Sequence, residues 1–222
     1  MIDRLRGGGA EPQSLDFVVA ALLLGAVYVA AEVADTTRAG RMLTGVLVYA
    51  AALVLLRGVR ASRTTMQVAF VLITLAVGLR IVSAANDVEA LRLAVSVLHV
   101  GIAGAAPFLV LRFIFRAGTV TLNVVFAGIT LYLLVGVLFG IVYTDLAWAV
   151  PGVFEPAQEV ATTGDSRLFY FSFVTLTTVG FGDIAPASDL TRSLVVLEAL
   201  IGQVVLVVLI ARLVGSVESR RA

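Results

Sequence analysis

The stretch Thr177-Thr178-Val179-Gly180-Phe181-Gly182-Asp183 places a polar turn, punctuated by two glycines, between two long apolar segments of the chain. Glycine has no Cβ atom and therefore adopts backbone conformations that other residues avoid. Two glycines separated by one residue allow consecutive carbonyl oxygens to point toward one axis. Oxygen atoms arranged in this way can replace the water molecules around a cation, so the stretch indicates an ion filter.

This stretch and its surroundings resemble the potassium channel family, whose filter is a Thr-Val-Gly-Tyr/Phe-Gly sequence. The matching residues are 178–182, with phenylalanine where tyrosine is commoner. The preceding segment, Leu168–Thr177, resembles the family's aromatic-rich pore helix and ends in threonines. Apolar segments of membrane length flank both features. This combination is more specific than an isolated Gly-x-Gly sequence.

The resemblance implies how the filter binds its ion. The implied ion-binding residues are Thr178, Val179, Gly180, Phe181 and Gly182, with K+ held by the carbonyl oxygens of the first four and by the Thr178 hydroxyl. One chain supplies a quarter of such a ring, so the resemblance implies a homotetramer with cyclic symmetry. The expected partners are therefore three further copies of this chain and membrane lipid.

Four residues are expected to support the filter. Asp183 follows it at the family's usual position, and Tyr170 stands where relatives often have an aromatic that bonds this aspartate. A Tyr170–Asp183 contact and simple packing of the Tyr170 ring are the two interpretations. Thr177 could bond back to carbonyl groups of the pore helix. Glu198 lies in apolar sequence, where a carboxyl group is costly unless paired, so we expect a hydrogen bond to the back of the pore helix.

Two further residues leave alternatives open. Gly202 falls near the middle of the last apolar segment, where relatives have a hinge glycine, but close helix packing is a competing explanation. His99, the sole histidine, could respond to pH or could hydrogen-bond across helices.

Composition identifies a membrane protein and narrows its chemistry. The chain has 222 residues, 60% of them hydrophobic and only 14% charged, with a mean hydropathy of +1.04. The absence of cysteine excludes disulfides and thiolate metal sites. The sequence has no ATP motif, nucleophile motif or metal-ligand spacing, so we expect no enzyme activity, no cofactor beyond the transported K+, and no nucleic-acid partner.

Six apolar segments approach or exceed the length of about twenty residues that crosses a bilayer as a helix. They are Leu15 to Ala34, Met42 to Leu56, Met66 to Ala85, Leu91 to Phe115, Val120 to Tyr143, and Leu190 to Val214. The second is short enough to be interfacial. The expected fold is an all-α membrane protein with six transmembrane helices and a re-entrant pore helix and filter between the fifth and sixth.

The expected organisation is a cytoplasmic segment at 1–14, a four-helix membrane domain at 15–117, a pore domain at 118–215 and a short cytoplasmic tail at 216–222. Within the pore domain we expect an outer helix at 120–143, a pore helix at about 166–177 and an inner helix at 190–214. Ten of the sixteen arginines then lie on the cytoplasmic side, which favours a plasma-membrane protein with both termini inside.

The four N-terminal helices resemble a voltage sensor only in number. The fourth carries Arg92 near one end and Arg112 and Arg116 near the other, without arginine at every third position, so strong voltage sensing is not expected. Acidic residues of the outer loop outnumber Arg167 and would concentrate cations there; they are Asp145, Glu155, Glu159, Asp165, Asp183 and Asp189.

The resemblance implies passive, selective K+ conduction through a tetramer. A nonselective cation channel and a nonconducting accessory subunit of another channel are the alternatives. A membrane enzyme ranks last, because no span contains a cluster of charged residues.

Overall fold

The computed structural model describes residues 16–26, 89–118, 120–150, 152–156 and 166–218, together with single residues and pairs between 51 and 79. Its labelled helices are α4 (Glu89–Arg116), α5 (Leu122–Ala149), α7 (Ser166–Leu176) and α8 (Asp189–Glu218), and its strands are β1 (Phe154–Glu155) and β2 (Ala185–Pro186). A further apolar helix spans Asp16–Ala26.

Within the described part of the chain, three helical stretches are long and apolar enough to cross a membrane. These are Ser96–Arg116, Leu122–Ala149 and Asp189–Val214, which correspond to the fourth, fifth and sixth predicted spans. The first predicted span is described only over Asp16–Ala26, and the second and third lie largely outside the described residues. The count of six therefore stays a prediction, as do the tail beyond Glu218 and the segment at 1–14.

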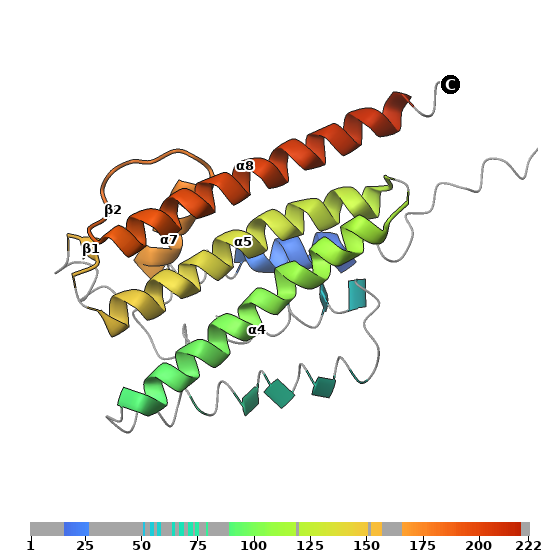
Figure 1. Cartoon of the computed structure of the whole chain (residues 1–222). Coiled ribbons are helices and arrows are strands. Elements are labelled where there is room, and N and C mark those ends of the chain that lie inside the picture. The colour runs from blue at the N-terminus through green and yellow to red at the C-terminus, as the bar shows by residue number, and fades with distance from the viewer. Residues whose placement is uncertain are drawn as a thin grey trace, which may run out of the picture.

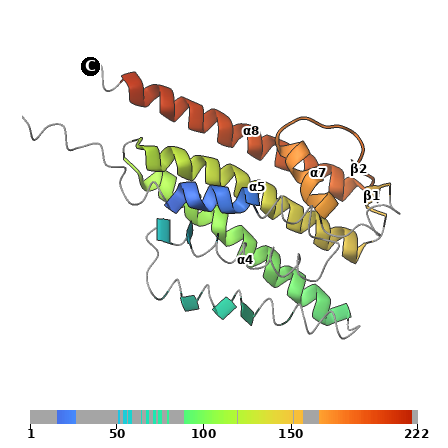
Figure 2. The same ribbon diagram turned by 180° about the vertical axis from the view of Figure 1, so that it is seen from behind.

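The long helices lie side by side, with α5 between α4 and α8 (Figure 1). The short helix α7 packs against α5 and α8 at the end of the molecule where β1 and β2 pair. Seen from behind, the helix Asp16–Ala26 runs beside α4 and α5 (Figure 2). Its Phe17 ring lies 5.1 Å from that of Phe113 in α4, and its Phe17 carbonyl accepts a hydrogen bond from Thr130 in α5.

The outer helix is longer than the sequence analysis predicted. We expected it to end at Tyr143, but α5 continues to Ala149, and the Val150 N–H then bonds the Leu146 carbonyl at 2.9 Å. Between Tyr143 and Pro151 the sequence contains no glycine or proline that would end the helix. Pro151 itself disfavours the helical conformation in Val150, the residue before it. The connector to α7 therefore begins after Ala149. The inner helix likewise extends beyond Val214, to Glu218.

The start of α8 is fixed by a reciprocal cap. The Thr191 N–H bonds the Ser188 hydroxyl at 3.2 Å, while the Ser188 N–H bonds Thr191 Oγ1 at 3.1 Å. This arrangement is a capping box in which threonine replaces the usual Glu or Gln. The Thr191 hydroxyl also contacts the Val153 carbonyl, next to the β1–β2 pair, so the outer loop is anchored to the first turn of α8.

The opposite end of α8 is attached to α4. The Arg212 guanidinium donates a hydrogen bond of 2.7 Å to the Ile114 carbonyl and lies 5.4 Å from the centre of the Phe115 ring. A cation at a helix C-terminus complements the helix dipole and pairs carbonyl groups that have no partner within the helix. Both ends of α8 are thus tied to other elements of the same chain.

A triad of aromatic rings joins α5, β1 and α7. The ring centroids of Tyr143, Phe154 and Phe171 lie 5.4 to 5.5 Å from one another. Tyr143 and Phe154 are fully or almost fully buried. Tilted and edge-to-face pairs of this kind add specific attraction to the burial of apolar area. The triad fixes one side of α7 against the outer helix.

Two glycines of α5 form a seam for two phenylalanines of α7. An added Cβ would lie 2.8 Å from the Phe173 ring at Gly136 and 2.5 Å from the Phe169 ring at Gly140. Residues four apart share a helix face, so the two glycines and the two rings meet in register. Helices in lipid gain little from the hydrophobic effect, and such close approach supplies their packing energy.

We expect Gly140→Ala to destabilise the protein by about 1–3 kcal/mol, because the new methyl group overlaps the Phe169 ring. The measurement is the midpoint of thermal unfolding in detergent. Gly104→Ala in α4 is the matched control, since an added Cβ there meets no described atom within 4 Å. An equal effect of both substitutions would contradict a packing role for this seam.

Candidate functional site

The segment after α7 has an alternating backbone. Thr178, Gly180 and Gly182 have φ values of +60°, +57° and +78°, whereas Val179 and Phe181 between them do not have positive φ. Among the described residues, Thr178 is the one non-glycine residue with positive φ. Such alternation turns successive peptide planes so that their carbonyl groups can face one side. A non-glycine residue in this region costs about 1–2 kcal/mol, so the surroundings must impose it.

Hydrogen bonds to the last turn of α7 impose this backbone. The Val174 carbonyl accepts bonds from the N–H groups of Val179, at 3.0 Å, and Gly180, at 3.4 Å. The Thr175 carbonyl accepts from the Thr178 N–H at 2.9 Å. Carbonyl groups at a helix C-terminus have no partner within the helix. Here they hold the first residues of the segment 178–182.

The two remaining terminal carbonyls of α7 are also paired. The Thr177 hydroxyl bonds the Phe173 carbonyl at 2.7 Å, which confirms the predicted back-bond of Thr177. The Leu176 carbonyl accepts a bond of 3.0 Å from the Tyr132 hydroxyl of α5. Tyr132 was not among the residues predicted from the sequence, although a tyrosine within an apolar span needs a partner for its hydroxyl group.

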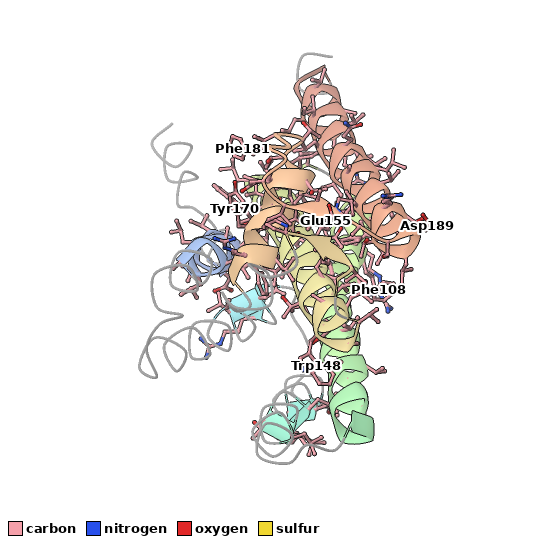
Figure 3. All side chains as sticks on the ribbon, turned by 90° about the vertical axis from the view of Figure 1, so that its left-hand side faces the viewer. Phe108, Trp148, Glu155, Tyr170, Phe181 and Asp189 are labelled. Carbon is pink, nitrogen blue, oxygen red and sulfur yellow. The ribbon has the colours of Figure 1, made fainter. Side chains whose placement is uncertain are left out.

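Tyr170 and Phe181 stack, with their rings almost parallel at 3° and their centroids 6.4 Å apart. Figure 3 shows both residues on one side of the molecule, with Asp189 at the start of α8 on the other side. Phe181 and Asp183 are exposed in the single chain. The Tyr170 ring thus packs on Phe181 of the segment that follows α7. Both interpretations of Tyr170, packing around the pore helix and contact with Asp183, stay predictions.

Glu198 of α8 is completely buried, and its side chain contacts both α5 and α7. Its Oε2 accepts a hydrogen bond of 2.7 Å from the Tyr143 hydroxyl of α5, and its Oε1 is hydrogen-bonded to the Ser172 hydroxyl of α7. The predicted hydrogen bond between Glu198 and the pore helix is therefore confirmed. The Ser172 oxygen also lies 2.8 Å from the Gly136 carbonyl. Ser172 was not predicted from the sequence, where it is a small polar residue in an otherwise aromatic run.

Gly202 lies against the last residue of α7. An added Cβ would be 2.7 Å from Leu176 Cδ1 and 3.1 Å from the Leu176 carbonyl oxygen. The close-packing interpretation of Gly202 is therefore correct, while a bend at this glycine stays a prediction.

Charged groups near this end of the molecule are mostly exposed. Glu155, Asp183 and Asp189 are exposed, and Asp189 forms an ion pair of 3.7 Å with Arg192. Asp145 belongs to α5, not to the loop. Glu159 and Asp165 lie outside the described residues, as does the side chain of His99. No group of three or more His, Cys, Asp or Glu within the described residues could hold a metal ion.

Two antiparallel membrane-length helices that flank a short helix and a segment of alternating φ define a pore-type membrane domain. Residues 120–219, which include α5, α7 and α8, match a protein-family model described as "Ion channel". The chain therefore contains an ion channel domain, and this family is one of channels, not of enzymes. Comparisons with curated proteins and with solved structures gave no match.

We expect Gly202→Ala to lower the thermal unfolding midpoint, because its methyl group meets the Leu176 backbone, which cannot move as a side chain can. Adding Leu176→Ala to this variant should restore part of the lost stability, since it removes the Cδ1 atom that lies 2.7 Å from the new methyl group. Unchanged stability of Gly202→Ala would show that α8 and α7 are not in close contact at this point.

Proposed function

We propose that this protein is a potassium-selective channel that conducts K+ passively down its electrochemical gradient. The observation that carries the proposal is the alternating backbone of residues 178–182, fastened to the end of α7. Carbonyl oxygens of Thr178, Val179, Gly180 and Phe181 would replace the hydration shell of K+, with the Thr178 hydroxyl at the inner end. Gly182 completes the segment.

The proposed assembly is a homotetramer with fourfold symmetry, because a single chain provides one side of the oxygen ring. Exposed apolar side chains on α8 support this assembly. They include Val196, Leu197, Leu200, Val204, Val207 and Ile210. Neighbouring copies and membrane lipid would cover this surface, which a single chain leaves open.

In the plasma membrane, the proposed subunit has six spans and both termini in the cytoplasm. The described helices fit this orientation, since the filter segment and the C-terminus of α8 lie at opposite ends of the molecule (Figure 1). Exposed Glu155, Asp183 and Asp189 at the filter end would concentrate cations at the outer mouth.

Purified protein reconstituted into liposomes should carry K+ flux that Ba2+ blocks and that exceeds Na+ flux under the same gradient. The reversal potential measures the K+ to Na+ permeability ratio directly. Equal permeability to the two ions would indicate a nonselective cation channel. Absence of flux at every voltage and pH tested would favour the accessory-subunit alternative.

The substitution Gly180→Ala should abolish K+ conduction while the tetramer still assembles, because alanine disfavours the positive φ of this position. Single-channel recording and size-exclusion chromatography measure the two effects. Gly152→Ala is the matched control: Gly152 has φ +82°, and an added Cβ at either glycine meets no described atom within 4 Å. Selective current through Gly180→Ala would mean that ions follow another route.

A further inference from the structure

The side chain of Glu198 connects all three helices of the pore region. It projects from α8, its Oε2 contacts Tyr143 of α5, and its Oε1 contacts Ser172 of α7. Ser172 in turn contacts the Gly136 carbonyl of α5. Glu198, Tyr143 and Ser172 are all fully buried. No arginine among the described residues forms an ion pair with Glu198.

The number of protons available for these hydrogen bonds decides whether the Glu198 carboxyl group is ionised or neutral. A serine hydroxyl has one proton, whereas a main-chain carbonyl and an ionised carboxylate can only accept. Ser172 lies between two such acceptors if Glu198 is ionised, and one of its two close contacts then has no proton. A neutral carboxyl group supplies the missing proton. Glu198 then donates to Ser172, Ser172 donates to the Gly136 carbonyl, and Tyr143 donates to Glu198.

The contacts between α8 and α7 occur at two points in register. Glu198 and Gly202 are four residues apart on α8 and meet Ser172 and Leu176, which are four residues apart on α7. Between those two residues of α7 lie Phe173, Val174 and Thr175, whose carbonyl groups hold the filter segment. The position of Ser172 therefore sets the position of the carbonyl groups on which the filter rests.

We propose that Glu198 is a neutral hydrogen-bond donor that positions the selectivity filter by fixing α7 between α5 and α8. This inference rests on the proposed function, since it assigns the ion selectivity of that filter to a buried contact outside the pore. Glu198 is a positioning residue: it acts through Ser172 and α7 without touching the ion. A neutral donor also avoids the cost of an unpaired charge among apolar helices.

The proton assignment is tested independently of ion conduction by infrared spectroscopy of the wild-type protein at neutral pH. We expect the carbonyl-stretch band of a protonated carboxylic acid, and we expect Glu198→Gln to lack this band. Wild-type protein without this band, or a band that persists in Glu198→Gln, would overturn the neutral-donor assignment. Neither result depends on whether the protein conducts K+.

The positioning role is tested by comparing two substitutions at the same site in liposomes. Glu198→Gln keeps a donor for Ser172 and an acceptor for Tyr143, so its K+ to Na+ permeability ratio should stay close to that of the wild type. Glu198→Leu removes both contacts, and its ratio should fall about tenfold, the factor expected when a buried hydrogen bond is lost. A Gln variant as defective as the Leu variant would overturn the donor role.

Ser172→Ala provides a second measurement if Glu198→Leu does not assemble. It removes the hydroxyl that links α8 to α7, and it should lower the permeability ratio by a similar factor. Ser193→Ala is its matched control, because Ser193 is an exposed residue of α8 that bonds only within its own helix, to the Asp189 carbonyl. A normal ratio in an assembled Ser172→Ala tetramer would overturn the positioning role. Wild-type liposomes without selective K+ flux would instead refute the proposed function itself.

Discussion

The arrangement of α5, α7 and residues 177–180 depends on the four terminal carbonyl groups of α7. A helix C-terminus leaves such groups without partners inside the helix, and buried polar groups without partners are costly. Here the Phe173, Val174 and Thr175 carbonyls pair with the residues that follow, and the Leu176 carbonyl pairs with Tyr132 of α5. The same bonds that complete the helix therefore impose the backbone of residues 178–182.

Because these bonds start from α7, residues 178–182 are held only as firmly as α7 is held between α5 and α8. The contacts that hold α7 come from small residues and polar groups, as expected where lipid removes the hydrophobic advantage of burial. The glycine pair of α5 accepts two phenylalanine rings, and Gly202 of α8 accepts the end of the helix. The aromatic triad also holds α7 against α5, and the Glu198 contacts join α8 to both of these helices.

The sequence predicted the parts of this arrangement that depend on local chemistry. The positive φ of Gly180 and Gly182, the membrane-length helices and the need of Glu198 for a partner follow from residue types alone. The identity of the partners does not, since Ser172, Tyr132 and Tyr143 depend on how the helices are placed. The Gly136-x-x-x-Gly140 pattern was a usable signal for the α5–α7 contact. The positive φ of Thr178 has no such signal, because threonine does not favour it.

The attachments of α8 divide it into two parts with different partners. Glu198 and Gly202 hold its first half on α7, whereas Arg212 holds its last turns on the C-terminal end of α4. A bend at Gly202 would therefore move the second half with α4 and leave the Glu198 contact in place. The close fit of Gly202 against the Leu176 carbonyl means that such a bend would also disturb the end of α7. If the protein conducts as proposed, such a bend would link the inner end of α8 to the geometry of residues 178–182 through the pair Gly202 and Leu176. The moving part of α8 would then act on the ion path without touching the ion.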